Sequence, residues 1–201
     1  MAFTVPPPRS PIDGGVARWY EHELGWATAA GPPVQLVTGL RFDALELPAA
    51  AGRGVLRRMG SAVGPVALMG RRMRLLVAAG SADELPGLLD WLEWGGISLD
   101  LAMLGTDGRM TAPRPPGWSG SGAPGAAVWL RAPEPGREVE SSLPALWPSV
   151  RGGAGAPCLA RLVAAAAAEC HRVRLLSAVR VRPRGAAPAT QQLVPQRFAS
   201  S

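Results

Sequence analysis

The chain has 201 residues, of which 47% are hydrophobic, so it is long and apolar enough for one folded domain with a sizeable core. Its two cysteines and an N-terminal segment without an apolar signal core argue against a secreted, disulfide-rich protein and favour the reducing cytoplasm. The longest apolar run, residues 162–168, is too short to span a bilayer, so no membrane partner is expected.

The formal net charge of +6 is distributed unevenly. Residues 1–150 contain 13 Arg and 14 acids, a net charge of −1, whereas residues 151–201 contain 8 Arg and one acid, a net charge of +7. An anionic partner such as nucleic acid and a merely solubilising tail both explain this asymmetry. The chain has neither Lys nor Asn, which indicates a high-GC bacterial genome, so the abundance of Arg by itself does not identify a function.

The first quarter of the chain predicts a helix, two strands and a second helix. Residues 1–12 are rich in Pro and are expected to be disordered. Asp13 is a suitable N-cap for a helix over residues 13–24. Apolar runs predict strands over 34–37 and 40–47. Pro48 suits the first turn of a helix over 48–59.

An antiparallel pair of strands follows. Residues 66–69 and 73–78 are apolar runs joined by a Gly-containing turn, which is typical of a hairpin. Ser81 and Glu84 have the spacing of a capping box, which predicts a helix that continues to residue 94. Trp91 is expected in the core on one face of this helix.

Shorter strands are predicted in the third quarter, at residues 97–101, 109–112 and 128–130. Residues 112–125 are rich in Gly and Pro and are predicted to form a loop. Together, the elements of residues 13–150 predict an α+β domain with a small mixed or antiparallel sheet flanked by helices.

The C-terminal quarter predicts a linker, a helix and a tail. Residues 151–156 resemble a linker, and residues 157–179 have helical apolar spacing with Arg161 and Arg172 on the polar side. We expect an amphipathic basic helix there and a disordered basic tail over 180–201. The sequence leaves open whether the helix packs on the domain.

The order of these elements and several short motifs resemble the N-terminal domain of bacterial bifunctional DNA primase-polymerases. The motifs that carry the resemblance lie within residues 15–135: Ala17-Arg18-Trp19-Tyr20 through Gly25-Trp26, Leu40-Arg41-Phe42-Asp43-Ala44-Leu45-Glu46, Gly96-Ile97-Ser98-Leu99-Asp100, the segment from Gly105 to Pro116 with Ala112-Pro113, and Trp129-Leu130 before Pro133. The resemblance implies a prim-pol-like fold and a role in DNA replication.

The resemblance also implies that the catalytic site is degenerate. Polymerising members use two acids on one strand, a histidine and a later acid, and the acids bind two divalent metals. Here Asp43 lies on the acidic strand, but Leu45 occupies the position two residues on, and Glu46 is predicted to face solvent on the other side. No histidine occurs among residues 72–75. Asp43 and Asp100 are therefore candidate catalytic and metal-binding remnants, with Mg²⁺ or Mn²⁺ as cofactor only if that remnant functions.

Basic side chains provide the other candidate site, because arginine donates paired hydrogen bonds to phosphate. The candidate nucleic-acid-binding residues are Arg53, Arg57, Arg58, Arg71, Arg72, Arg74, Arg161 and Arg172. Three hypotheses follow: a prim-pol-like domain that binds DNA, RNA or nucleotide without robust polymerase activity; a non-enzymatic regulatory or scaffold protein whose C-terminal helix docks on a protein partner; and an active primase-polymerase with an unusual metal site.

Overall fold

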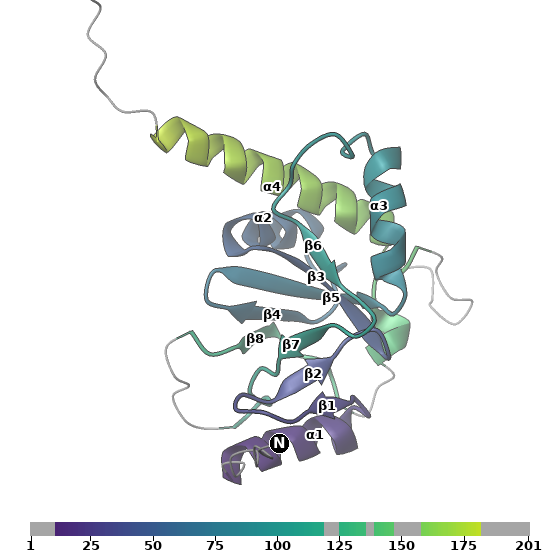
Figure 1. Ribbon diagram of the computed structural model, residues 1–201, viewed down its shortest axis with the longest axis vertical. Coiled ribbons are helices and arrows are strands. Elements are labelled where there is room, and N and C mark those ends of the chain that lie inside the picture. The colour runs from purple at the N-terminus through teal and green to yellow at the C-terminus, as the bar shows by residue number, and fades with distance from the viewer. Residues whose placement is uncertain (1–10, 119–124, 136–138, 147–157, 182–201) are drawn as a thin grey trace, which may run out of the picture.

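The computed structural model describes residues 11–118, 125–135, 139–146 and 158–181 (Figure 1). These residues form four α-helices and two antiparallel sheets, so the predicted α+β fold class is confirmed. Most of the N-terminal segment, the whole expected linker over 151–156 and nearly all of the basic tail lie outside the described residues.

The larger sheet has five strands in the order β6-β3-β5-β4-β8, and every pair is antiparallel. Strand β3 lies between β6 and β5, and its side chains alternate between two buried faces. Leu45 and Leu47 face one hydrophobic cluster, and Phe42 and Ala44 face another. The strands are β3 (Phe42–Pro48), β4 (Val66–Met69), β5 (Arg72–Ala78), β6 (Ala102–Leu104) and β8 (Val128–Arg131).

Three helices cover one face of this sheet: α2 (Ala49–Met59), α3 (Ser81–Trp91) and α4 (Leu159–Val181) (Figure 1). Small residues let α2 approach its neighbours closely. A Cβ at Gly52 would lie 2.2 Å from the sulfur of Met73, and a Cβ at Gly54 would lie 2.1 Å from Oε2 of Glu169. Helix α4 therefore packs directly on α2, and it belongs to the core of the domain.

The other face carries α1 (Pro11–Glu23) and the small sheet of β1 (Thr28–Ala29), β2 (Gln35–Val37) and β7 (Arg109–Thr111) (Figure 1). A short 3-10 helix, Val139–Ser142, adds Val139 to this side of the core. Tyr20 anchors this layer, because its hydroxyl donates to the carbonyl of Pro113 at 2.7 Å and accepts from Nε1 of Trp129 at 2.7 Å. Burial raises the pKa of Tyr20 above its usual range.

Several local predictions were wrong. The expected strand over residues 97–101 is not a strand, and the ladder begins at Ala102. No side chain caps α3 at its N-cap, Gly80, so the predicted capping box of Ser81 and Glu84 does not form there. Trp91 is 73% exposed, because its place at the end of α3 turns it to solvent.

The ends of two helices also differ from the prediction. Helix α1 begins at Pro11, within the segment expected to be disordered, and α4 continues to Val181. No helix in the described part of the chain is long and apolar enough to cross a membrane.

Candidate functional site

Asp43 is completely buried on the helix-facing side of β3. Its Oδ2 accepts the amide N–H of Ala82 at 2.8 Å, in the first turn of α3. The N-cap of α3 is Gly80, which has no side chain to accept a hydrogen bond from the first amides of the helix. The carboxylate of Asp43 therefore takes the place of a local cap. Burial raises the pKa of Asp43, more than the amides of Ala82 and Gly80 lower it. Asp43 therefore has a structural function in this fold.

Asp100, the other candidate metal ligand, does not lie beside Asp43. Its carboxylate is 67% exposed and forms an ion pair with Nη1 of Arg72 at 2.6 Å. Strand β6 pairs Ala102 with Glu46, and continuing this register brings Asp100 level with Pro48. That position is five residues along β3 from Asp43, roughly 16 Å at the rise of a strand.

The two candidate metal ligands are therefore not brought together. Among the described residues no group of three or more His, Cys, Asp or Glu side chains is placed to hold a metal ion. The acids present do not fit the two-metal site that the resemblance implies, because one caps a helix and the other pairs with an arginine.

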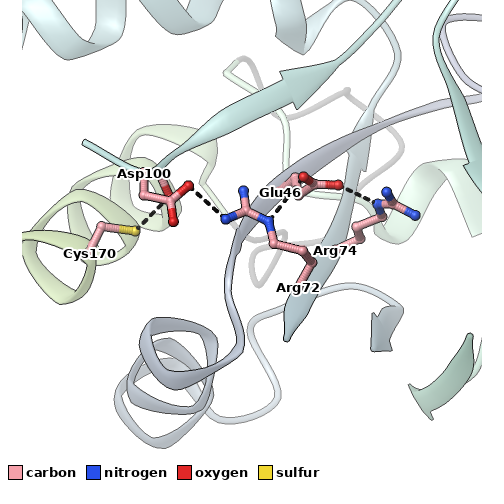
Figure 2. A network of polar contacts seen from close by, with 5 residues as sticks. All are labelled: Glu46, Arg72, Arg74, Asp100 and Cys170. Carbon is pink, nitrogen blue, oxygen red and sulfur yellow. Dashed lines mark hydrogen bonds and ion pairs between the residues drawn. The ribbon is translucent and has the colours of Figure 1, made fainter. Parts of the chain in front are cut away.

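Glu46 is at the centre of a charged network on the opposite face of the sheet (Figure 2). Its Oε1 accepts from Nε of Arg72 at 3.1 Å and its Oε2 from Nε of Arg74 at 2.7 Å. The side chain is only 18% exposed, so the expectation that it faces solvent was wrong: its cross-strand partner is Arg74. Burial opposes the charge of Arg72, but Asp100 and Glu46 outweigh it and raise the pKa of Arg72.

This network is electrically neutral, since two arginines face two carboxylates. A phosphate that bound Arg72 would compete with two existing ion pairs, and Arg74 is held by Glu46. Because side chains alternate along β5, these two arginines point away from the face that α2 covers. They do not join the arginines of α2 in a single surface.

Cys170 and His171 do not form a catalytic pair. The thiol of Cys170 donates to the carbonyl of Asp100 at 3.5 Å, whereas the ring of His171 packs against Trp94 with centroids 5.6 Å apart. Burial, and the negative charges of Asp100 and Glu169, raise the pKa of Cys170 to about 12 despite the opposing effect of Arg72. The thiol stays protonated at neutral pH and is a poor nucleophile.

Five of the predicted basic residues gather on the helical side of the domain. We call them the α2–α4 arginine surface: Arg53, Arg57, Arg58, Arg71 and Arg161. All five are exposed, and none forms an ion pair with a described residue.

Backbone geometry brings the members of this surface together. The amide N–H of Ala49, the first residue of α2, donates to the carbonyl of Arg71 at 2.8 Å, so the β4–β5 turn adjoins the start of α2. Arg53 and Arg57 are one helical turn apart on the solvent side of α2. Arg58 and Arg161 line one groove of about 290 Å³ between α2 and α4. Arg172, in contrast, pairs with Glu169 at 2.8 Å.

A feature that the sequence analysis did not identify is a groove beside the C-terminal half of α4, lined by Ile97, His171, Arg174 and Leu175 among others. A signal for it exists in the sequence. The apolar period that runs through Cys170 and Val173 leaves Leu175 off the core face.

Comparisons of this chain with protein-family models, curated proteins and solved structures find no match. The resemblance to primase-polymerases therefore remains a prediction from short motifs.

Proposed function

We propose that this chain is a primase-polymerase-like domain with depleted catalytic motifs that binds nucleic acid without polymerase activity. The observation that supports it is the α2–α4 arginine surface, in which five exposed arginines have no ion-pair partner among the described residues. Arginine forks donate two hydrogen bonds to a phosphate, and a surface that spans two helices and a turn presents several forks at once.

A non-catalytic role is favoured over nucleotidyl transfer by the two remnant acids. Asp43 is buried as the acceptor for an amide of α3, and Asp100 is paired with Arg72. A two-metal mechanism needs both carboxylates on one site with open coordination positions. We therefore propose no Mg²⁺ or Mn²⁺ cofactor, and we expect no metal-dependent nucleotide incorporation.

The arrangement also predicts the strength of the salt dependence. Five arginines that each neutralise one phosphate give a slope of log affinity against log salt of about −4.5 on duplex DNA and about −3.5 on a single strand. The groove between Arg58 and Arg161 is shallow and lacks aromatic side chains, so it suits a phosphate rather than a stacked base. We expect binding with little sequence preference.

The test is a titration of labelled single-stranded and duplex DNA at about 50 and 200 mM salt, followed by fluorescence anisotropy. The double variant Arg57→Gln/Arg161→Gln should weaken binding at low salt and reduce the slope by about two on duplex DNA. Arg18→Gln/Arg109→Gln is the matched control, because it removes two exposed arginines from α1 and β7 on the other side of the large sheet.

Equal weakening by the two double variants would mean that net charge, and not this surface, determines binding. Binding that disappears when residues 182–201 are removed, and that Arg57→Gln/Arg161→Gln leaves unchanged, would assign the activity to the tail. A shorter truncation that also removes α4 would not test the tail, because α4 supplies Leu159, Leu162 and Val163 to the core.

The alternative of a regulatory or scaffold protein is favoured by a different observation. The C-terminal half of α4 exposes Leu175, Leu176 and Val179. Aliphatic side chains have no role in binding a polyanion, and they indicate a protein contact instead.

A further inference from the structure

A groove runs along the C-terminal half of α4, where this helix passes the segment between α3 and β6. It measures about 580 Å³, and its walls include Ile97 and Ser98 on one side and His171, Arg174, Leu175 and Ala178 on the other. Hydrogen bonds fix the two walls relative to each other, because Arg174 donates to the carbonyl of Ser98 and Cys170 donates to that of Asp100. The groove is therefore preformed.

The groove and its surroundings expose aliphatic side chains. Ile97 is 37% exposed, Leu175 is 54% exposed, and Val179, one turn beyond Leu175, is 71% exposed. The C-terminal end of α4 projects past the other described elements, so none of them covers it (Figure 1). An apolar patch with a polar rim is typical of a protein-interaction site.

The ionisable side chains that line the groove are an arginine and a histidine. Its lining includes Arg174 and His171 but no acid, and Glu169, the only acid of α4, is buried against α2. The Nδ1 atom of His171 is buried and has no hydrogen-bond partner among the described residues. In the sequence, the segment of residues 151–201, to which α4 belongs, has a net charge of +7. The groove therefore favours an acidic occupant.

We propose that this groove binds an acidic amphipathic helix of a protein partner. An apolar side chain of that helix would pack between Ile97 and Leu175, and a carboxylate would accept from Arg174. A helix fits better than an extended segment, because the groove follows the axis of α4 and residues 96–98 offer no strand edge for β-addition. This inference is independent of the proposed nucleic-acid binding, which uses other residues.

Two other occupants fit less well. A second copy of this chain would bring the basic side chains of two α4 helices together, and like charges oppose that contact. Nucleic acid would leave Leu175 and Val179 without a role.

The test uses three synthetic helical peptides labelled with a fluorophore. One has Leu on its apolar face and Glu on its flanks, the second keeps the Leu face but has Lys flanks, and the third keeps the Glu flanks but has Ala in place of Leu. We expect the full-length protein to bind the first peptide at least tenfold more tightly than either of the others, as measured by fluorescence anisotropy.

The variant Leu175→Asp should weaken binding of the Leu/Glu peptide by about tenfold or more, because it places a carboxylate where the apolar contact is expected. Leu130→Asp is the matched control, since Leu130 is similarly exposed, at 49%, but lies on β8. Thermal unfolding of both variants checks that each remains folded.

Three outcomes would overturn the proposal. The first is tighter binding of the Lys peptide than of the Glu peptide. The second is binding of the Leu/Glu peptide that Leu175→Asp leaves unchanged. The third is a concentration-dependent dimer, detected by size-exclusion chromatography with light scattering and abolished by Leu175→Asp, which would assign the groove to a second copy of the chain.

Discussion

Replacing Asp43 by Asn separates a structural role of this carboxylate from a metal-binding one. Its Oδ2 accepts the N–H of Ala82, and an Asn side chain keeps an oxygen in that position. The other carboxylate oxygen, Oδ1, has no hydrogen-bond partner among the described residues, so the amide nitrogen of Asn replaces an atom that was already unpaired. We expect Asp43→Asn to lower the free energy of unfolding at pH 7 by no more than about 0.5 kcal/mol, or to raise it, because the amide carries no buried charge.

Asp43→Ala should behave differently, because it removes the acceptor altogether. A buried amide without a partner, or the loss of a helix cap, costs about 1–2 kcal/mol. Urea unfolding of the wild type and both variants at pH 7, followed by far-UV circular dichroism, gives the three free energies of unfolding.

The pH dependence gives a second measurement of the same role. Burial raises the pKa of Asp43, so the folded state holds a proton at pH values where the unfolded state has lost it. Stability should therefore fall as the pH rises above the usual pKa of aspartate, until the raised pKa is passed. Asp43→Asn should lack this part of the decline.

Two results would refute the reasoning on Asp43. One is a loss of stability in Asp43→Asn as large as in Asp43→Ala. The other is a rise in the melting temperature of the wild type with Mn²⁺ that Asp43→Asn abolishes, since this would show that the carboxylate binds metal.

Two further substitutions, with Gly87→Ala as a control, test the packing of the fold. Gly54→Ala should destabilise the domain by about 1–3 kcal/mol, because the new methyl group would collide with the buried side chain of Glu169 and displace it from its ion pair with Arg172. Gly87→Ala in α3, where nothing lies within 4 Å, should be neutral or stabilise by up to about 1 kcal/mol. Tyr20→Phe should cost about 1–3 kcal/mol, because the hydroxyl lies between a backbone carbonyl and an indole N–H in the core. Chemical denaturation measures all three, and a stable Gly54→Ala would contradict the close contact of the two helices.

The sequence predicted the β4–β5 hairpin because its information is local. Apolar runs on either side of Gly70 are a sufficient signal, and the two strands pair across it. The start of α2 after Pro48 is predictable for the same reason. The fold class follows from the succession of such elements.

Two of the failures have a different cause, since each depends on a partner far along the chain. The cap of α3 comes from Asp43, 39 residues before Ala82, so a local box of Ser81 and Glu84 could not reveal it. Residues 97–101 have the apolar alternation of a strand, but contacts from Arg174 and Cys170 hold the backbone of this segment and no ladder pairs it.

The candidate site, too, has features that follow from local sequence and features that depend on distant contacts. Exposure of Arg53 and Arg57 follows from helical spacing, which the sequence contains. Arg72 and Arg74 are neutralised because the strand register places Glu46 opposite Arg74. Packing across the whole sheet sets this register. The sequence could therefore locate the arginines but not decide which of them are free.

The two proposed interaction sites lie at different positions along α4. Arg161 lies near the start of the helix and Leu175 is 14 residues further on, about 21 Å along the axis at the rise of an α-helix. A nucleic-acid strand on the α2–α4 arginine surface and a helix in the groove would therefore contact different turns of α4. Both sites depend on α4 remaining packed on α2 through Gly54, so this helix pair is the structural element that holds the two surfaces in a fixed relation.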